Sequence, residues 1–258
     1  MLESADRVLR AIEVFHESER DLSLSDIAER LSLPKSSVHR LLATLIEHDF
    51  IERDPLTRRY RLGIRLFEIG ASVLRDRGLQ SVAYPVVKNL ALTTGETCHL
   101  AVLSGTDAVY IYKVDGASSI IMSSRMGGRA PCYATSIGKV LLAWGGDELF
   151  TRVVEAGLRP YTHNTITNPA KLKAELEAIR FRGYALDLEE LEQGLRCVAT
   201  SVRDHFGRVV AAIGIAGPSW RLSDNQLDSF VQAVMTAGDS ISRNLGYLPD
   251  QATAATGS

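Results

Sequence analysis

Apolar residues of the segment 23–48 recur at helical spacing in two successive runs. In the first run, Ser25 is expected to cap a short helix, because its hydroxyl can accept a hydrogen bond from a free backbone N–H. This helix is expected to end near Pro34, since proline has no N–H to donate and suits the first turn of the helix that follows. In the second run, four residues at i, i+3, i+4 and i+7 predict one buried helix face: Val38, Leu41, Leu42 and Leu45.

Residues after the second helix alternate like two short strands. The segments 50–53 and 59–62 flank the turn sequence Asp54-Pro55-Leu56-Thr57, which predicts a hairpin rich in arginine. Two helices joined by a tight turn and followed by a basic hairpin are typical of a winged helix-turn-helix that binds DNA. The candidate DNA contacts are cations and hydroxyls on the outer face of the second helix and in the hairpin: Lys35, Ser36, Ser37, His39, Arg40, Thr44, Arg53, Arg58 and Arg59.

Further helices are expected on both sides of this motif. The segment 4–17 predicts an amphipathic helix that packs behind the second helix and completes a three-helix core. The segment 63–77 predicts another helix, which ends at Gly78. Its apolar residues fall on more than one face, which is typical of a helix that forms a dimer contact. A helix that packs only on its own domain would show the same pattern.

From Gly95 onward the pattern changes to short β-type runs that alternate with helices. Strands are expected at 98–103, 109–114, 120–123, 184–187, 195–204 and 209–216. Helices are expected at 79–94, with a kink or restart at Pro85, and at 136–144, 147–156, 169–182 and 224–245. Strands, helices, strands and a closing helix predict an α+β domain with a mostly antiparallel sheet.

Composition narrows the class of protein. A length of 258 residues with 45% apolar residues predicts about two globular domains. The formal net charge of −2 excludes a uniformly basic, histone-like protein, so any basic footprint is local. No run reaches the ~18 apolar residues needed to span a bilayer, and Glu3 and Asp6 are unlike the start of a signal peptide. Three widely spaced cysteines form no disulfide framework, so a cytoplasmic protein is expected.

Five segments, taken in order, resemble the IclR family of transcriptional regulators. They read RVLRAIEVF, DIAERLSLPKSSVHRLLATLIEHDFIERD, YRLGIRLFEIG, GGRAPCYATSIGKVLLA and GYALDLEELEQGLRCVATSVRDHFGRVVAAIGIAGP, within residues 5 to about 245. The resemblance implies an N-terminal winged helix-turn-helix, a linker helix that dimerises and a C-terminal effector-binding domain of GAF-like type. It also implies homodimers or homotetramers on double-stranded operator DNA.

The resemblance further implies where a small organic acid would bind. Some members of the family have serines where Gly214 and Ala216 stand, so the wall here is expected to be apolar and roomier, which suits an aromatic carboxylate. Tyr133 stands where a histidine is common and would add aromatic surface at the pocket mouth. The effector-binding positions implied in this way are Tyr133, Ser136, Ile137, Asp187, Cys197, Gly214 and Ala216.

The residues also support an anion site independently of the resemblance. A helix that begins at residue 136 would present the free backbone N–H groups of residues 136–138 to a carboxylate. Arg125 and Arg129, in the glycine-bearing loop before it, could bind an anion with two hydrogen bonds. Asp187 is a candidate partner for a ring hydroxyl. Simpler roles explain the same residues: a solvated Arg125, a polar strand end at Asp187 and a small buried hydrophobe at Cys197.

Three other functions stay open. An enzyme would use Cys197 as nucleophile with His99, His163 or His205 as base. A DNA-bound architectural protein would leave the second half of the chain without a role. A redox- or metal-responsive regulator would need several side chains to converge with ligand geometry, namely Cys98, His99, Cys132 and Cys197.

We therefore interpret the chain as an α+β protein with two domains. Residues 1–63 are expected to form the winged helix-turn-helix, 64–78 the linker and dimerisation helix, 79–248 the effector-binding domain and 249–258 a disordered tail. The favoured function is a ligand-responsive DNA-binding regulator of a catabolic operon, with repression favoured over activation. No cofactor, metal or catalytic activity is expected.

Overall fold

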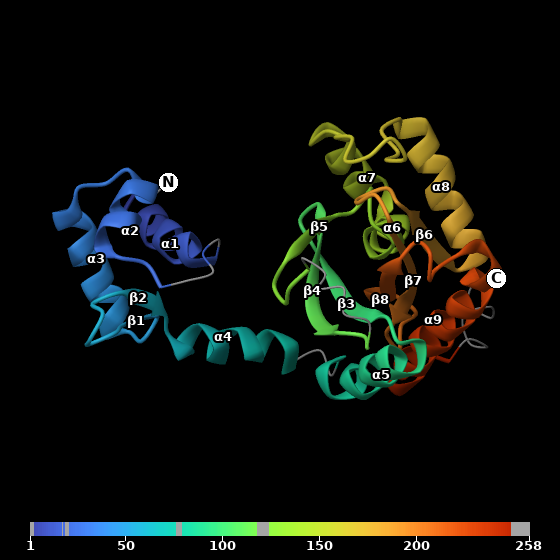
Figure 1. Cartoon of the computed structure of the whole chain (residues 1–258), viewed down its shortest axis with the longest axis horizontal. Helices are drawn as coiled ribbons and strands as arrows, with labels where there is room; N and C mark the ends of the chain where they lie inside the picture. The colour runs from blue at the N-terminus through green and yellow to red at the C-terminus, as the bar shows by residue number, and fades with distance from the viewer. Residues whose placement is uncertain (1–2, 17, 19–20, 76–78, 118–123, 249–258) are drawn as a thin grey trace. The chain divides into compact units, whose positions relative to one another are not determined.

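The computed structural model describes residues 3–16, 18, 21–75, 79–117 and 124–248. The chain divides into two compact units, residues 1–77 and 78–258 (Figure 1). The strand expected at 120–123 and the tail expected at 249–258 lie outside the described residues. Across the described ranges, no helix combines the length and the apolar character needed to cross a membrane.

The first unit contains four helices and one hairpin within its described residues. They are α1 (Glu3–His16), α2 (Leu24–Leu31), α3 (Lys35–Glu47), β1 (Ile51–Arg53), β2 (Tyr60–Leu62) and α4 (Ile64–Arg75). The cap predicted at Ser25 is wrong, because α2 is capped by Ser23. The Ser23 hydroxyl accepts a hydrogen bond from the Asp26 N–H, and the Asp26 carboxylate accepts one from the Ser23 N–H. This reciprocal pair satisfies two backbone donors, which Ser25 could not do.

A single apolar core joins α1, α2, α3 and the hairpin. Val38, Leu42 and Leu45 on α3 are buried in it, as are Ile51 and Tyr60 from the two strands. The segment before α2 is tied to the hairpin by paired backbone hydrogen bonds between Leu22 and Tyr60. The buried face of α3 therefore points inward, and its opposite face is left open to solvent.

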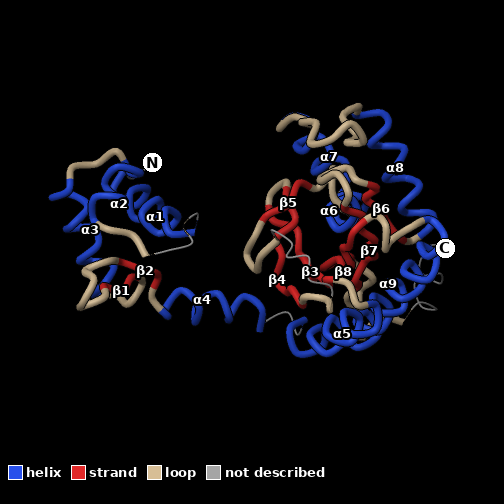
Figure 2. Tube along the Cα trace, viewed as in Figure 1, coloured by secondary structure: helices blue, strands red, loops and turns tan. Residues whose placement is uncertain are grey.

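The second unit holds an antiparallel sheet of six strands in the order β5-β4-β3-β8-β7-β6 (Figure 2). Its elements are α5 (Leu79–Thr94), β3 (Thr97–Ser104), β4 (Asp107–Val114), β5 (Arg129–Pro131), α6 (Ser136–Ala143), α7 (Gly146–Glu155), α8 (Pro169–Arg182), β6 (Tyr184–Leu188), β7 (Leu195–Arg203), β8 (Val209–Pro218) and α9 (Asp224–Asn244). The α+β prediction is confirmed. Pro85 lies inside α5, so the helix does not restart there. The short strand β5 was not predicted.

The two faces of the sheet differ in the size of their side chains. On β8, Ile213 and Ile215 face the core formed with α5 and α9, whereas Ala212 faces the core formed with α6. All eight residues of α6 are buried. Close packing requires Gly138, because a Cβ at that position would lie 2.5 Å from the Cα of Cys132. Small residues under α6 therefore let its N-terminus approach the sheet.

Candidate functional site

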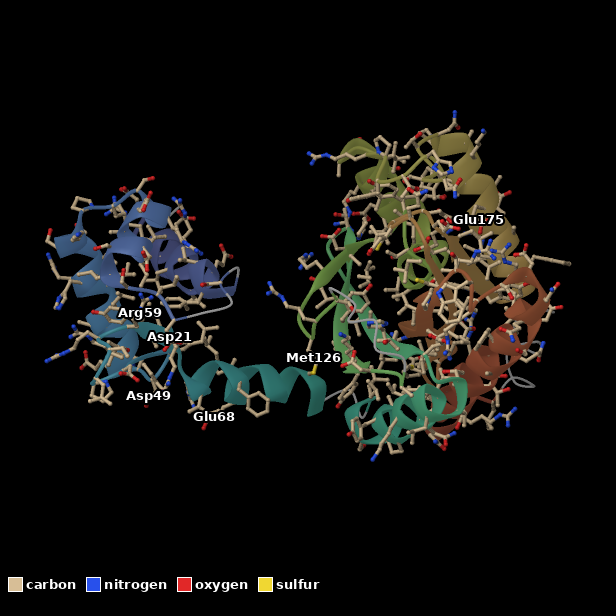
Figure 3. All side chains as sticks on the ribbon, in the orientation of Figure 1. Asp21, Asp49, Arg59, Glu68, Met126 and Glu175 are labelled. Carbon is tan, nitrogen blue, oxygen red and sulfur yellow. The ribbon has the colours of Figure 1, made fainter. Side chains whose placement is uncertain are left out.

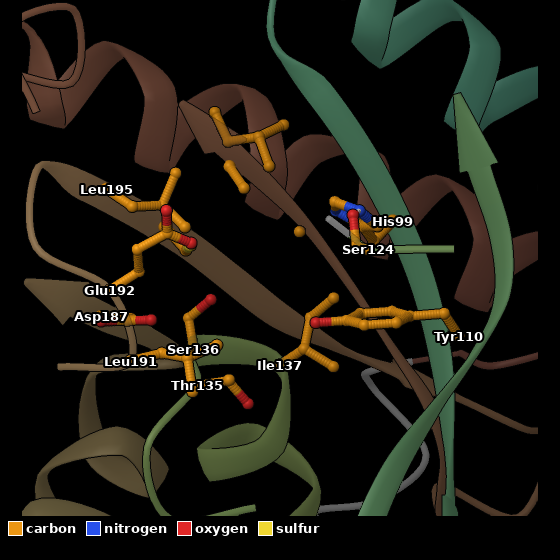
Figure 4. Close-up of a pocket in the computed structure, with 14 residues that line it drawn as sticks. His99, Tyr110, Ser124, Thr135, Ser136, Ile137, Asp187, Leu191, Glu192 and Leu195 are labelled. Atoms are coloured by element: carbon orange, nitrogen blue, oxygen red, sulfur yellow. Dashed lines mark hydrogen bonds between the residues drawn. The ribbon is translucent and has the colours of Figure 1, made fainter. Parts of the chain in front are cut away.

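A cavity of about 190 Å³ lies between the sheet and the N-terminus of α6 (Figure 4). The register of the sheet places Asp187 opposite Cys197 and Cys197 opposite Ala216, so three strands contribute neighbouring side chains. Six of the sequence-predicted effector residues line this cavity: Ser136, Ile137, Asp187, Cys197, Gly214 and Ala216. Eight further residues line it and were not predicted as effector contacts: His99, Tyr110, Ser124, Thr135, Leu191, Glu192, Leu195 and Ile215.

Residues at the start of α6 line this cavity. Thr135 caps the helix, and its hydroxyl accepts the Gly138 N–H at 3.1 Å, so the prediction of a free amide at Gly138 is wrong. The first-turn N–H groups of Ser136 and Ile137 remain without an intrahelical acceptor. Ser136 is 2% exposed, and its hydroxyl has no protein partner among the described residues. Together these groups suit an anion.

Asp187 supplies the buried carboxyl group of the cavity. Burial raises the pKa of Asp187 to about 7, against a hydrogen bond of 2.7 Å from the Glu190 N–H that lowers it. The charge of Glu190 raises this pKa further, and that of Lys139 lowers it. Among the described residues that line the cavity, the charged ones are the two acids Asp187 and Glu192. An anionic ligand is therefore expected to bind through amides and hydroxyls rather than through a guanidinium.

The cysteines do not form a reactive or metal-binding cluster. Burial, followed by the charge of Asp187, raises the pKa of the Cys197 thiol well above its ordinary value, so it stays protonated and is a poor nucleophile. Cys98 and His99 are neighbours on β3 and point to opposite faces, with Cys98 in the core beside α5 and α9. In the described part of the chain, no group of three or more His, Cys, Asp or Glu side chains could hold a metal. The alternative based on Cys98, Cys132 and Cys197 is therefore not supported.

Three candidate anion or aromatic contacts lie outside the cavity lining. Tyr133 is buried, and its hydroxyl donates to the Arg159 carbonyl oxygen at 2.9 Å, in a separate depression beside Tyr161. Arg129 pairs with the Asp107 carboxylate at 3.0 Å. Arg125 is exposed and does not line the cavity.

Tyr110, a further polar residue that lines the cavity, was not predicted because of a β-bulge. The pairing of β3 with β4 shifts between Leu100 and Ala101, so that these residues oppose Tyr112 and Tyr110, respectively. Two tyrosines at i and i+2 therefore face opposite sides of the sheet, which strict alternation does not predict. The one available signal was His99, a polar residue within an otherwise apolar strand.

The exposed face of α3 carries all six predicted helix contacts: Lys35, Ser36, Ser37, His39, Arg40 and Thr44. In the hairpin, Arg59 donates to the Asp21 carbonyl oxygen at 2.9 Å and is held against its own domain (Figure 3). Arg53 lies over the Tyr60 ring, 5.3 Å from its centroid, and donates to the Arg58 carbonyl oxygen. The Arg58 side chain has no protein partner within the described ranges, so it is the hairpin cation most available to a phosphate.

Two family models match the chain. The IclR helix-turn-helix domain matches residues 4–55, and the C-terminal domain of bacterial IclR transcriptional regulators matches residues 71–243. The HTH-type transcriptional regulator XynR of Escherichia coli strain K12 is 38% identical over 248 residues, which cover 96% of this chain and 98% of XynR. The transcriptional repressor IclR of the same strain is 34% identical, over 95% of this chain and 90% of its own.

Solved structures show the same likeness. The crystal structure of Thermotoga maritima IclR has a TM-score of 0.79 and 35% identity, and the match covers 96% of this chain and all of that one (100%). An IclR homolog from Microbacterium hydrocarbonoxydans, crystallised with 4-hydroxybenzoate, has a TM-score of 0.85 and 28% identity over 94% of this chain and 99% of its own. A DNA-binding domain and an effector-binding domain in family order, with these relatives, show that the chain belongs to the IclR family of bacterial transcriptional regulators.

Proposed function

We propose that this chain represses a catabolic operon and responds to an aromatic carboxylate bound in the α6 cavity. The observation that carries this proposal is the division of the cavity into an anion site and an apolar wall. The anion site consists of the Ser136 and Ile137 N–H groups with the Ser136 hydroxyl, and Ile137 and Ala216 contribute to the wall. An aromatic acid has the same division into a charged group and an apolar ring.

The size of the cavity supports a ring rather than a two- or three-carbon acid. A cavity of about 150 Å³ is known to accept benzene. At about 190 Å³, the present cavity has room for one ring with a small substituent, and glyoxylate or pyruvate would leave its apolar part unfilled. The relative crystallised with 4-hydroxybenzoate provides a precedent for this ligand class on the same fold.

Of the two small residues on the wall, Gly214 and Ala216, only Ala216 is a suitable site for a longer side chain. A Cβ at Gly214 would lie 2.5 Å from the Val198 carbonyl oxygen, so a serine there would force β7 and β8 apart. A combined Gly214→Ser and Ala216→Ser change would therefore disturb the sheet as well as the ligand. Ala216→Ser alone is the cleaner probe.

The Ala216→Ser variant is expected to bind 4-hydroxybenzoate more weakly by ~1–3 kcal/mol, because the new hydroxyl is desolvated against the ring. Isothermal titration calorimetry measures this change. Ala170→Ser, in the exposed first turn of α8, is the matched control and should leave affinity unaltered. Tight binding of pyruvate or glyoxylate, with no binding of any benzoate, would contradict the ligand class while leaving the regulator assignment intact.

The proposed DNA interface places α3 in the major groove and the hairpin on the backbone. Lys35, Ser36 and Arg40 lie on the solvent face of α3, where the buried face fixes their direction. Pro34 caps α3 without a side-chain hydrogen bond, which leaves first-turn N–H groups available to a phosphate. Arg58 extends from the hairpin and is expected to contact a phosphate rather than a base.

Arg40→Ala is expected to weaken operator binding by ~1–3 kcal/mol through loss of a base contact. Arg58→Gln should weaken binding to all sequences alike and reduce the salt dependence by about one released counterion. Fluorescence anisotropy with the promoter fragment beside the gene, titrated at several salt concentrations, measures both effects. Arg152→Ala removes an exposed cation from α7 in the other unit and should change neither. A sequence-specific loss in Arg58→Gln would contradict its phosphate role.

We further propose that α4 forms a two-fold dimer contact. Within its own unit, α4 exposes Ile64 (62%), Phe67 (71%) and Ile69 (45%), more apolar surface than a solvated helix needs. Palindromic half-sites also require a two-fold protein.

The purified chain is expected to be a dimer or tetramer in light scattering at micromolar concentration. Phe67→Glu should dissociate it, whereas Arg65→Gln on the same helix should not, and a monomeric wild type would contradict the proposal.

A further inference from the structure

The cavity has a second polar end, away from the anion site. In Figure 4, Ser136 and Asp187 lie on one side, His99 and Ser124 lie on the other, and Ile137 lies between them, with the Tyr110 hydroxyl reaching toward it from the His99 side. A ligand that spans the cavity therefore meets polar groups at both of its ends. The apolar contact at Ile137 falls in the middle, where a ring would lie.

His99 and Ser124 form a fixed pair at this second end. The distance from His99 Nε2 to Ser124 Oγ is 2.8 Å, and the His99 ring packs on Tyr110 with centroids 4.8 Å apart. Burial, followed by the charge of Lys113, lowers the pKa of His99 to about 4, so the ring is neutral at physiological pH. A hydroxyl can donate one hydrogen bond and accept two. The contact with His99 therefore leaves Ser124 with capacity for a ligand.

Tyr110 extends its phenol from the same side into the cavity. Its hydroxyl points toward Ile137 in the cavity and has no protein partner among the described residues (Figure 4). Burial raises the pKa of Tyr110, so its hydroxyl stays protonated and can both donate and accept. A polar group left unpaired in a buried site is unfavourable until water or a ligand bonds to it.

We propose that Tyr110 and Ser124 together bind a hydroxyl group at the end of the ring remote from the carboxylate, so that the effector class is para-hydroxylated aromatic acids. The proposal rests on the proposed function, since it takes the carboxylate to lie at Ser136 and Ile137. It reassigns the ring hydroxyl, which the sequence had placed at Asp187. Asp187 lies with Ser136 at the carboxylate end (Figure 4).

The test compares benzoate with 4-hydroxybenzoate by calorimetry in four proteins. The wild type is expected to prefer 4-hydroxybenzoate by about tenfold, the effect of one or two buried hydrogen bonds. Tyr110→Phe and Ser124→Ala should each lose most of this preference while still binding benzoate. Tyr112→Phe is the matched control, because it makes the same chemical change two residues along β4 on the opposite face of the sheet, and it should keep the preference.

The ratio of the two affinities separates hydroxyl recognition from general damage. A variant that merely packs badly loses affinity for both acids and keeps their ratio. A wild-type ratio near one, or wild-type ratios in both Tyr110→Phe and Ser124→Ala, would overturn the inference while benzoate binding still supported the proposed function. Absence of binding for both acids in the wild type would overturn the two proposals together.

Discussion

Replacing Lys139 with methionine is expected to destabilise the effector domain by about 3–5 kcal/mol. Lys139 is 1% exposed on α6 and forms an ion pair with the Glu190 carboxylate, which is also buried. Removal of the ammonium leaves a buried carboxylate without its partner. The second oxygen of that carboxylate, Glu190 Oε2, already has no hydrogen-bond partner among the described residues.

Denaturant unfolding followed by tryptophan fluorescence measures this loss selectively, because both tryptophans, Trp144 and Trp220, lie in the second unit. The double variant Lys139→Met, Glu190→Leu should recover most of the stability, since an apolar pair of similar size replaces the ion pair. Arg208→Met is the control. Arg208 is 70% exposed in its pair with Asp204, so its loss should amount to no more than about 1 kcal/mol. Equal losses in the two single variants would contradict the buried pair.

The deficit of Lys139→Met should also depend on pH. Burial raises the pKa of Glu190, and Lys139 lowers it, so the variant raises it further. A carboxyl group whose pKa is higher in the folded than in the unfolded chain lowers the free energy of unfolding at pH values where the unfolded chain is ionised. Between the ordinary glutamate pKa and the raised folded-state pKa of wild-type Glu190, both proteins lose stability alike. The deficit should therefore be smallest below that folded-state pKa and grow as the pH rises above it. A deficit independent of pH would contradict this origin.

The sequence predicted most of the secondary structure because local signals agree with the tertiary contacts. The helix expected at 169–182 has the predicted bounds, since Pro169 opens it and Gly183, in the left-handed region at φ 86°, ends it. The cap of α2 was predicted at Ser25 and lies at Ser23, because Ser23 is the serine that exchanges hydrogen bonds with Asp26. The strand β5 has three residues and is defined by its partner β4, so no local pattern marks it.

The cavity was only half predictable for a similar reason. Residues on β6, β7 and β8 follow from alternation and from the family resemblance, and the cross-strand register brings Asp187, Cys197 and Ala216 together. Tyr110 faces the cavity because a bulge reverses the alternation on β4, which depends on pairing with β3. Lys139 is equally hidden in the sequence. A lysine is expected in solvent, and its burial depends on Glu190, 51 residues away in the chain.

Effector binding is expected to take up a proton through Asp187. The pKa of Asp187 is raised to about 7 by burial, with Cys197, Glu190 and Lys139 as its charged or titratable neighbours and Glu192 on the same cavity wall. A carboxylate bound at Ser136 and Ile137 adds a negative charge at that end of the cavity and favours the protonated form of Asp187. Protonated Asp187 can then donate a hydrogen bond, whereas ionised Asp187 repels the ligand.

The sign of the pH dependence follows from this linkage. Below pH 7 Asp187 is already protonated in the free protein, so affinity should change little. Above pH 7 each binding event must bring one proton, so the dissociation constant should rise about tenfold per pH unit. Calorimetry with benzoate at pH 6 to 9, in buffers of different ionisation enthalpy, counts the protons directly. Benzoate serves as the probe because its single acidic group is ionised throughout this range.

Asp187→Asn is the matched variant, because its amide oxygen can still accept the Glu190 N–H and its amide N–H can replace the carboxyl proton. We expect this variant to bind benzoate at pH 6 about as well as the wild type does, and to lose the decline above pH 7 together with the proton uptake. If the wild type takes up no proton at pH 8.5, Asp187 does not titrate with the ligand. If Asp187→Asn keeps the full slope, another group is responsible, and Glu192, the other acid on the cavity wall, is then the residue to replace next.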